Sequence, residues 1–376
     1  MPTSDAINDK EKKEAGDNAS STITIITDIN IIYDRLQRSQ RLEEESKTLA
    51  AAALLDGIDQ THFQQVHHQI IKEAELFRRL IHDSASSDHS NENSDEWIKQ
   101  GEEHGGRHDF SIYYKVDTNT NQITCRLETP IEPSLLIPIL AVLNESELYS
   151  TWIPRYMVPK LEVVKSEKLC QIGRVAQTIL VETEVPWPIT KRELILKAVA
   201  CDDIDNDDCT SDNSSGGLAT NNDNTNSRIL VRIQSLDCED NGEDGLEILP
   251  AENSVRIKVD GGFVFEKCPI DHPMAKKRQK LLSLSSHEDG DNRLILLTFT
   301  FSVDPKLSIM PQSFLNFFLR IVMRQIWGMF LNVAEEVGDG KRPAHSEAIE
   351  RKREELYDWI EERTNAMLQQ QSFNKW

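Results

Sequence analysis

The sequence predicts an α+β protein in which an antiparallel sheet packs against a long helix near the C-terminus, with further helices flanking this unit. Residues Ser254 to Glu266 alternate apolar and polar side chains, as do several other segments, which is typical of strands with one buried face. The segment from Phe314 to Val333 places apolar residues at the i, i+3, i+4, i+7 spacing of a helix buried along one side. We therefore expect this helix to cover one face of the sheet.

Composition limits the possible partners. The chain has 376 residues and a formal net charge of -21, more than half of it between Cys201 and Asn253. The electrostatic field of this negative charge repels phosphate backbones, so nucleic acid is not expected as a partner.

The six cysteines lack CxxC spacing, which argues against a disulfide framework and a zinc site and favours a reducing compartment. We expect no metal and no cofactor.

Two features bear on localisation. The polar N-terminal segment lacks the apolar core of a signal peptide. The most apolar helix, from Pro311 to Leu331, is interrupted by Arg320 and Arg324 and is therefore not expected to span a membrane. A cytoplasmic protein is predicted.

Changes in composition divide the chain into a central domain and flanking segments. Three histidines in the second N-terminal helix (His62, His67 and His68) are expected on a solvated face, and residues 23–32 fit either a strand-like tail or the lead-in to a helix. The predicted units are a disordered tail (1–32), N-terminal helices over Tyr33 to Leu55 and Thr61 to His82 (33–82), a linker (83–96), the main domain (97–337) with a disordered acidic insert (202–227), and a C-terminal helix (341–370).

The main domain opens with a hairpin and continues through a helix to a run of strands. A helix over Pro133 to Leu148 follows the hairpin. The expected strands are Phe110 to Val116, Ile123 to Leu127, Leu161 to Val164, Leu169 to Val181, Arg192 to Ala200, Arg228 to Ser235, Ser254 to Glu266 and Asn292 to Val303, the last four forming a meander with one wet face.

The segment Pro186-Trp187-Pro188 connects two of these strands. Each proline lacks a backbone N–H and has a fixed φ, so the segment cannot continue a central ladder and forms a rigid crossing that carries Trp187. A tryptophan that simply closes the end of a core explains the same residues.

Five motifs follow one another along the main domain. They are Trp97 before the Phe110 hairpin, Val142-Leu143-Asn144 leading to Trp152, Pro186-Trp187-Pro188 with Lys191-Arg192-Glu193, Ser302-Val303-Asp304-Pro305-Lys306 and Ile309-Met310-Pro311. Taken together, these motifs resemble those of the START family, the steroidogenic-acute-regulatory-protein-related lipid-transfer domains. The similarity runs from Trp97 to Val337, and the departures are Glu193 for aspartate, Leu307 for glycine and the acidic insert.

The resemblance implies a helix-grip fold, a curved antiparallel sheet wrapped around the long helix, with one lipid in an internal tunnel. It implies a gate formed by the Pro186-Trp187-Pro188 loop and the last helix. The expected lipid is a phospholipid, sterol or sphingolipid. Arg174 is the candidate for its polar head, although an arginine on the wet back of the sheet is equally compatible. The other candidate lipid-binding residues are Trp187, Phe263, Phe265, Leu297, Phe299, Phe314, Phe318, Val322, Ile326 and Met329.

Other functions remain open at this stage. An enzyme on the same fold is not expected, because the chain has no nucleophile elbow and no Gly-rich phosphate loop, and no catalytic residue is assigned. An interaction scaffold, with the flanking helices binding a protein partner, is compatible with lipid binding. The basic loop at Lys276 could make a transient contact with a membrane surface, or could be a solvated loop.

Overall fold

The protein is described here by a computed structural model. The described residues are 28–85, 97–103, 108–117, 122–153, 156–157, 160–185, 190–204, 227–238, 246–269, 272–275, 294–304 and 323–369. Most of the predicted N-terminal tail, of the linker and of the acidic insert lies outside these ranges, as does the basic loop at Lys276. The last residues of the predicted tail instead begin helix α1 (Ile29–Glu44), and the first residues of the predicted insert end strand β7 (Arg192–Asp203).

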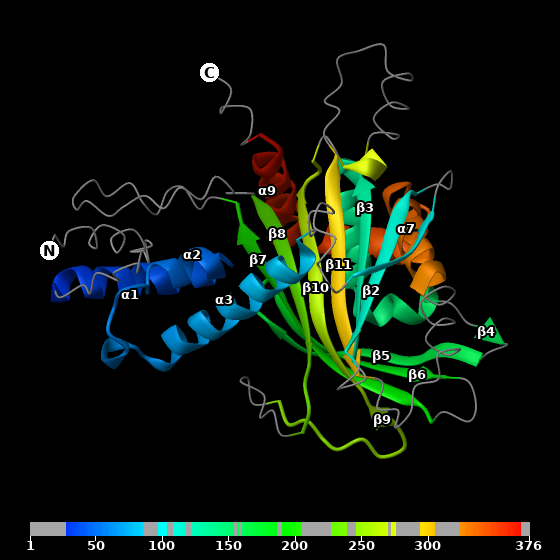
Figure 1. The fold of residues 1–376 in the computed structure, drawn as a ribbon, viewed down its shortest axis with the longest axis horizontal. Coiled ribbons are helices and arrows are strands. Elements are labelled where there is room, and N and C mark those ends of the chain that lie inside the picture. Colours follow the sequence, from blue (N-terminus) through cyan, green and yellow to red (C-terminus); the bar gives the residue numbers. More distant parts are fainter. Residues whose placement is uncertain are drawn as a thin grey trace, which may run out of the picture.

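An 11-stranded sheet dominates the fold, with the order β1-β2-β3-β11-β10-β8-β7-β6-β5-β4 and a short parallel partner, β9, on β7 (Figure 1). Its strands are β1 (Ile98–Glu103), β2 (Phe110–Asp117), β3 (Gln122–Ile131), β4 (Tyr156–Met157), β5 (Lys160–Ile172), β6 (Ala176–Glu184), β7 (Arg192–Asp203), β8 (Arg228–Ser235), β9 (Val255–Arg256), β10 (Lys258–Lys267) and β11 (Ile295–Asp304). The α+β class with a curved antiparallel sheet is confirmed, and so is the meander from β7 to β11.

Two differences from the predicted strands have local causes. The first strand, β1, was not predicted, because its sequence IKQGEE is polar and lacks alternation; it is held at the sheet edge by β2. The predicted strand from Leu169 to Val181 is instead the end of β5, a turn and most of β6. Gly173 has φ +55°, a left-handed conformation that glycine adopts without steric cost, and it starts the turn that carries Arg174.

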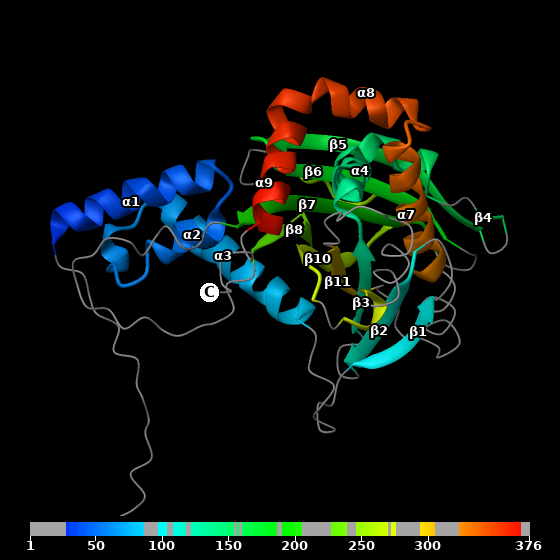
Figure 2. The ribbon, with the colours of Figure 1, turned by 90° about the horizontal axis from the view of Figure 1, so that it is seen from above.

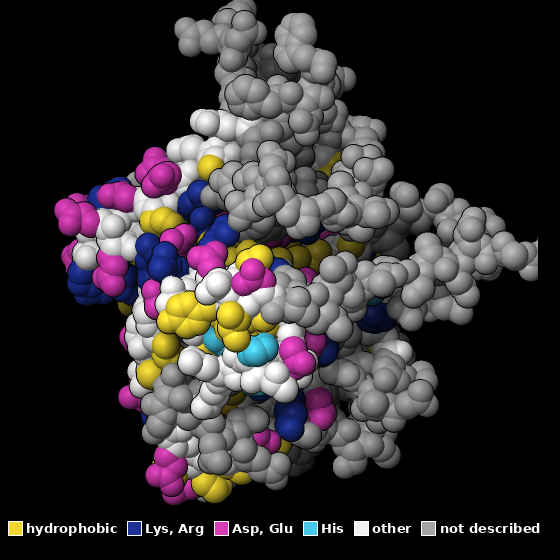
Figure 3. Space-filling model, turned by 90° about the vertical axis from the view of Figure 1, so that its left-hand side faces the viewer, with side chains coloured by type: hydrophobic (Ala, Val, Ile, Leu, Met, Phe, Trp, Pro, Cys, Tyr) yellow, Lys and Arg dark blue, Asp and Glu magenta, His cyan; other side chains and the backbone are white. Residues whose placement is uncertain are grey.

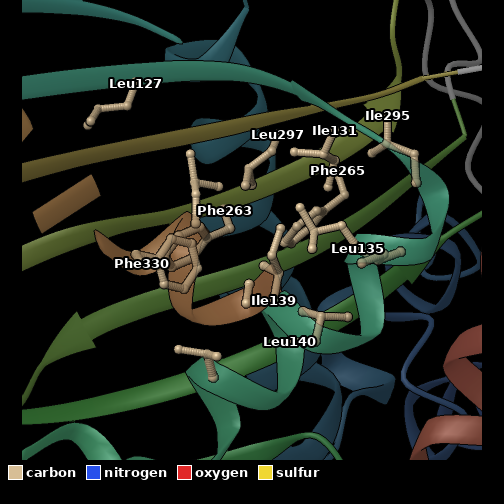
Figure 4. Packing of buried hydrophobic residues seen from close by; sticks show 14 of the residues in the cluster. Leu127, Ile131, Leu135, Ile139, Leu140, Phe263, Phe265, Ile295, Leu297 and Phe330 are labelled. Atoms are coloured by element: carbon tan, nitrogen blue, oxygen red, sulfur yellow. The ribbon is translucent and has the colours of Figure 1, made fainter. Parts of the chain in front are cut away.

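The concave face of the sheet is covered by helices α4 (Leu136–Asn144) and α7 (Arg324–Gly338). Short 3₁₀ segments, Pro133–Leu135 and Ser146–Thr151, flank α4 where a single longer helix was predicted. Phe263 of β10 stacks with Phe265 of the same strand and with Phe299 of β11, and it packs against Phe330 of α7. Figure 4 shows Phe263, Phe265 and Phe330 in this core. The sequence pattern of the last long helix thus corresponds to burial in the main core.

The convex face carries the N-terminal helices α1 (Ile29–Glu44), α2 (Thr48–Ala53) and α3 (Gln65–Ser84), with a 3₁₀ turn at Gln60–His62 (Figure 1). The first predicted helix is interrupted at Ser46, which has φ +67° and whose carbonyl accepts a hydrogen bond of 2.8 Å from the Asp202 N–H of β7. Phe77 of α3 packs with Leu230 and Val264 of the sheet. The helices therefore share a second core with the sheet.

This covering corrects the expectation of a wet back. Arg232 of β8 is only 2% exposed, and its guanidinium lies 2.8 Å from the Glu73 carboxylate of α3. His67 is also buried rather than solvated: its Nδ1 accepts a hydrogen bond of 3.0 Å from the Gln64 N–H at the start of α3. Strand alternation cannot reveal such contacts, because it does not show that a distant helix covers the polar face.

The surface around the N-terminal helices has no single sign of charge over the described residues. Figure 3 shows acidic and basic side chains intermixed on this side of the molecule, with apolar side chains and histidine beside them. The exposed apolar residues of α1 are Ile29, Ile31 and Tyr33.

The C-terminal segment folds back over the concave side as α8 (Pro343–Arg351), a π-helical turn (Arg353–Tyr357) and α9 (Asp358–Gln369) (Figure 2). One continuous helix was predicted here; the structure bends it at the π turn. Leu356, Ile360 and Met367 join the main core, so the thin apolar stripe of this segment faces the sheet. No helix among the described residues is long and apolar enough to cross a bilayer.

Gly262 of β10 offers a test of the two-sided packing of the sheet. A Cβ at this position would lie 2.1 Å from the Val231 carbonyl oxygen and 2.9 Å from Leu80 Cδ2 of α3. We predict that Gly262→Ala lowers the free energy of unfolding by about 2 kcal/mol or more, measured by chemical denaturation. Gly328→Ala in α7 is the matched control, because no atom lies within 4 Å of its Cβ position. It is expected to be neutral or to add up to about 1 kcal/mol; equal losses in both variants would contradict this packing.

Candidate functional site

A cavity lies between the sheet, α4 and the C-terminal segment. Its volume is about 120 Å³. One water molecule takes up about 10–15 Å³ of a cavity volume of this kind, so the cavity has room for about ten waters. Ten waters occupy about 300 Å³ in the liquid. That is the lower end of the range for small-molecule sites. The lining residues are Leu140, Leu143, Asn144, Tyr149, Arg174, Val175, Gln177, Ile179, Leu196, Ala198, Ala200, Cys201, Asp202, Ile229, Val231, Ile233, Phe263, Leu356, Tyr357, Trp359, Ile360 and Arg363.

The strands supply an apolar wall. Leu196, Ala198 and Ala200 alternate along β7, so their side chains share one face of the sheet, and Ile229, Val231 and Ile233 repeat the pattern on β8. Cys201 also borders the cavity, and burial raises the pKa of its thiol to about 12. This thiol is therefore neutral at physiological pH and adds no charge to the wall.

The opposite wall comes from the C-terminal segment and not from α7. Leu356 and Ile360 are buried, and Tyr357 is 1% exposed. Among the described residues of α7, none lines the cavity. The segment predicted only as a flanking helix therefore closes the space.

Polar contacts hold this segment in place. Arg363 of α9 forms an ion pair with Asp202 at the end of β7, with 2.6 Å between Nε and Oδ2. Nearer the π turn, the Glu145 carboxylate accepts hydrogen bonds from Lys352 Nζ at 2.7 Å and from the Tyr357 hydroxyl at 3.3 Å. Burial, followed by the charge of Glu145, raises the pKa of Tyr357 far above its ordinary value, so its hydroxyl remains a donor.

Arg174 marks a polar position in the wall. It lies in the β5–β6 turn, and its guanidinium carbon is 4.0 Å from the centroid of the Trp359 ring of α9. Its Nε is buried and has no hydrogen-bond partner among the described residues. The sequence predicted Arg174 on a strand, between Ile172 and Ala176. In the structure it lies in a turn instead.

The predicted lipid-binding residues divide into three groups. Arg174 and Phe263 line the cavity. Phe265, Leu297, Phe299 and Met329 belong to or pack against the main core, and Ile326 of α7 is partly buried and does not line the cavity. Trp187, Phe314, Phe318 and Val322 lie outside the described residues.

The gate expected at Pro186-Trp187-Pro188 also lies outside the described residues. Arg192 starts β7, while Asp202, which pairs with Arg363, lies near the other end of the strand. The sequence did not predict that the C-terminal segment forms a wall of the cavity. Its apolar stripe of Leu356, Trp359 and Ile360 was visible in the sequence, but the position of this stripe over the sheet depends on the path of the chain after α7.

Arg192 and Glu193, at the start of β7, have structural roles with different partners. Glu193 forms an ion pair with Arg256 of β9, and Arg192 donates a hydrogen bond of 2.7 Å to the Thr190 carbonyl. Among the described residues, no group of three histidine, cysteine or acidic side chains is placed to hold a metal ion.

Comparison with known proteins gives similarity of fold only. No protein-family model and no curated protein matches the sequence. A fragment of the STAR-related lipid transfer protein of Xanthomonas axonopodis is 16% identical, with 64% of this chain and 98% of that chain covered and a TM-score of 0.39. Human StAR-related lipid transfer protein 5 is 12% identical, covering 73% and 99%, with a TM-score of 0.44, and human STARD10 is 11% identical, covering 70% and 80%, with a TM-score of 0.43.

The Arg363–Asp202 pair should fix α9 over the cavity. We predict that Arg363→Ala destabilises this segment by about 3 kcal/mol, because it leaves a carboxylate that is 2% exposed without its cation. Hydrogen exchange of residues 353–369 measures the effect. Arg353→Ala is the control, because its ion pairs with Glu350 and Asp358 are exposed, and surface pairs contribute little to stability. Unchanged exchange in Arg363→Ala would show that the pair does not hold α9.

Proposed function

We propose that this protein binds one lipid-like molecule in the cavity between the sheet and the C-terminal segment, and that it carries or senses that molecule. The observation that supports the proposal most directly is the cavity itself, with strand residues on one side and Leu356 and Ile360 on the other. Apolar surface transferred from water to such a wall gains about 25 cal/mol for each Å². A hydrocarbon chain is therefore the ligand chemistry that the walls favour.

In our proposal, one wall of the cavity moves when a ligand enters. The C-terminal segment is the wall that follows the last core helix, and it is attached to the sheet through side-chain contacts such as Arg363–Asp202. In our proposal, α9 opens for loading and closes over the bound molecule, a gating step of the kind that lids perform. A further gate at Pro186-Trp187-Pro188 stays a prediction, as do a transient contact with a membrane surface and a cytoplasmic location.

Lipid binding is favoured over catalysis by the character of the wall groups. The Cys201 thiol is held neutral by burial, and Asp202 is engaged by Arg363. Neither is presented as a nucleophile or base toward the cavity. We accordingly propose a binding protein and not an enzyme.

An interaction scaffold is the second candidate, and one observation favours it. Ile29, Ile31 and Tyr33 expose apolar side chains at the start of α1, 66%, 50% and 63% of each being accessible. In contrast, the apolar faces of α2 and α3 are buried in the second core. A protein partner would thus meet the chain through α1, and this role is compatible with lipid binding.

Native mass spectrometry of the recombinant protein, followed by extraction of any bound molecule, tests the proposal. We expect one apolar molecule per chain. A protein with no bound molecule that takes up none from mixed liposomes would contradict lipid binding and favour the scaffold.

A cavity-filling variant links the bound molecule to this site. Ala198 lines the cavity from β7, and we predict that Ala198→Trp removes the bound molecule while the far-ultraviolet circular dichroism of the protein stays the same. Ala53→Trp is the control, because Ala53 is exposed on α2. Retention of the molecule in Ala198→Trp would place the ligand elsewhere.

A further inference from the structure

The positive charge at one position of the cavity wall has no counter-charge among the described residues. Two guanidinium groups line the cavity, those of Arg174 and Arg363. Asp202 is the one carboxylate among the described lining residues, and it pairs with Arg363 at 2.6 Å. For Arg174, no hydrogen bond or ion pair occurs within the part of the chain that the structure describes, and its Nε is buried.

Arg174 contacts the ring of Trp359. The guanidinium carbon lies 4.0 Å from the ring centroid, within the range of a cation–π contact. The N–H groups of a guanidinium can form paired hydrogen bonds to carboxylate or phosphate oxygens. The ring therefore holds the cation at the cavity wall but does not neutralise its charge.

A second polar group on the same wall has an open position. Gln177 of β6 donates from Nε2 to the Asn144 carbonyl at 3.3 Å, while its buried Oε1 accepts no hydrogen bond from the described residues. Leaving a buried donor or acceptor unsatisfied costs about 1–3 kcal/mol. A head group with a hydroxyl, such as a singly protonated phosphate, could donate to Oε1, whereas an ionised carboxylate only accepts hydrogen bonds and could not.

We propose that the ligand of this cavity is a single-chain amphiphile with an anionic head, a carboxylate or a phosphate, held by Arg174 on Trp359. This inference rests on the proposed lipid-binding function and adds the class of ligand. The negative charge of the head is chosen because Arg174 has no carboxylate partner among the described residues, and the single chain is chosen because the space, about 300 Å³ of liquid, lies at the lower end for small-molecule sites. The apolar chain lies against β7 and β8, and the head lies beside α9.

Isothermal titration calorimetry of the delipidated full-length protein tests the proposal with four probes. They are dodecanoate, dodecyl phosphate, 1-dodecanol and inorganic phosphate, each below its aggregation concentration. We expect the two anionic amphiphiles to bind about tenfold or more tightly than dodecanol, since a charge-assisted pair replaces an unbalanced cation. The ratio of the affinities for dodecanoate and dodecyl phosphate shows whether the site prefers a carboxylate or a phosphate head.

Arg174→Gln is the diagnostic variant. It is expected to weaken dodecanoate binding about tenfold and to leave dodecanol binding unchanged, because the substitution removes the charge and keeps the apolar wall. Arg174→Lys should keep part of the preference, and it provides a second test if Arg174→Gln does not fold. Arg38→Gln is the control for net charge, since Arg38 lies on α1 beside Asp34.

Each contrary outcome has a separate meaning. Equal affinity for dodecanoate and dodecanol in both the wild type and Arg174→Gln would overturn the anionic head while the proposed function stands. Inorganic phosphate binding as tightly as dodecyl phosphate would overturn a head-and-chain ligand. Stoichiometric capture of a two-chain phospholipid, without binding of any dodecyl probe, would overturn the single chain. No binding of any lipid would overturn the proposed function itself.

Discussion

Asp202, near the end of β7, connects three parts of the molecule. Its backbone N–H donates to the Ser46 carbonyl between α1 and α2, and its carboxylate pairs with Arg363 of α9. The carboxylate is 2% exposed, so its charge needs this cation. The position of the helix that closes the cavity is thereby tied to the strand that forms the opposite wall and to the helices behind the sheet.

The central strands were predictable because their alternation is strong, but their environment was not. Phe263 and Phe265 face the concave core, and Val264 between them packs on the second core with Phe77 of α3. The alternation was interpreted as one buried and one wet face, since Arg232 and Asp260 are charged. In the structure Arg232 meets Glu73, a residue 159 positions away, and sequence pattern does not encode such a long-range contact.

The candidate site was predictable only in part for the same reason. Arg174 and Phe263 were identified from the sequence and line the cavity, whereas Phe265, Leu297 and Phe299 fill the packed core. Helical periodicity shows which side of a helix is apolar, but it does not distinguish packing against a core from facing an open space. The apolar stripe with Leu356 and Ile360 was visible in the sequence, yet its place depended on the bend at the π turn.

The architecture makes the ligand and the closing helix interdependent. Trp359 belongs to α9, and its ring supports the Arg174 guanidinium from the β5–β6 turn. A head group held by Arg174 therefore binds better when α9 is docked, and α9 docks better when the head group is present, since coupling between two binding equilibria is reciprocal. Because α9 also pairs with Asp202, a filled cavity favours the arrangement in which the C-terminal segment, the end of β7 and the α1–α2 junction are joined. If the cavity binds the proposed amphiphile, its occupancy would thus be reported on the outside of the protein by the position of the C-terminal helix.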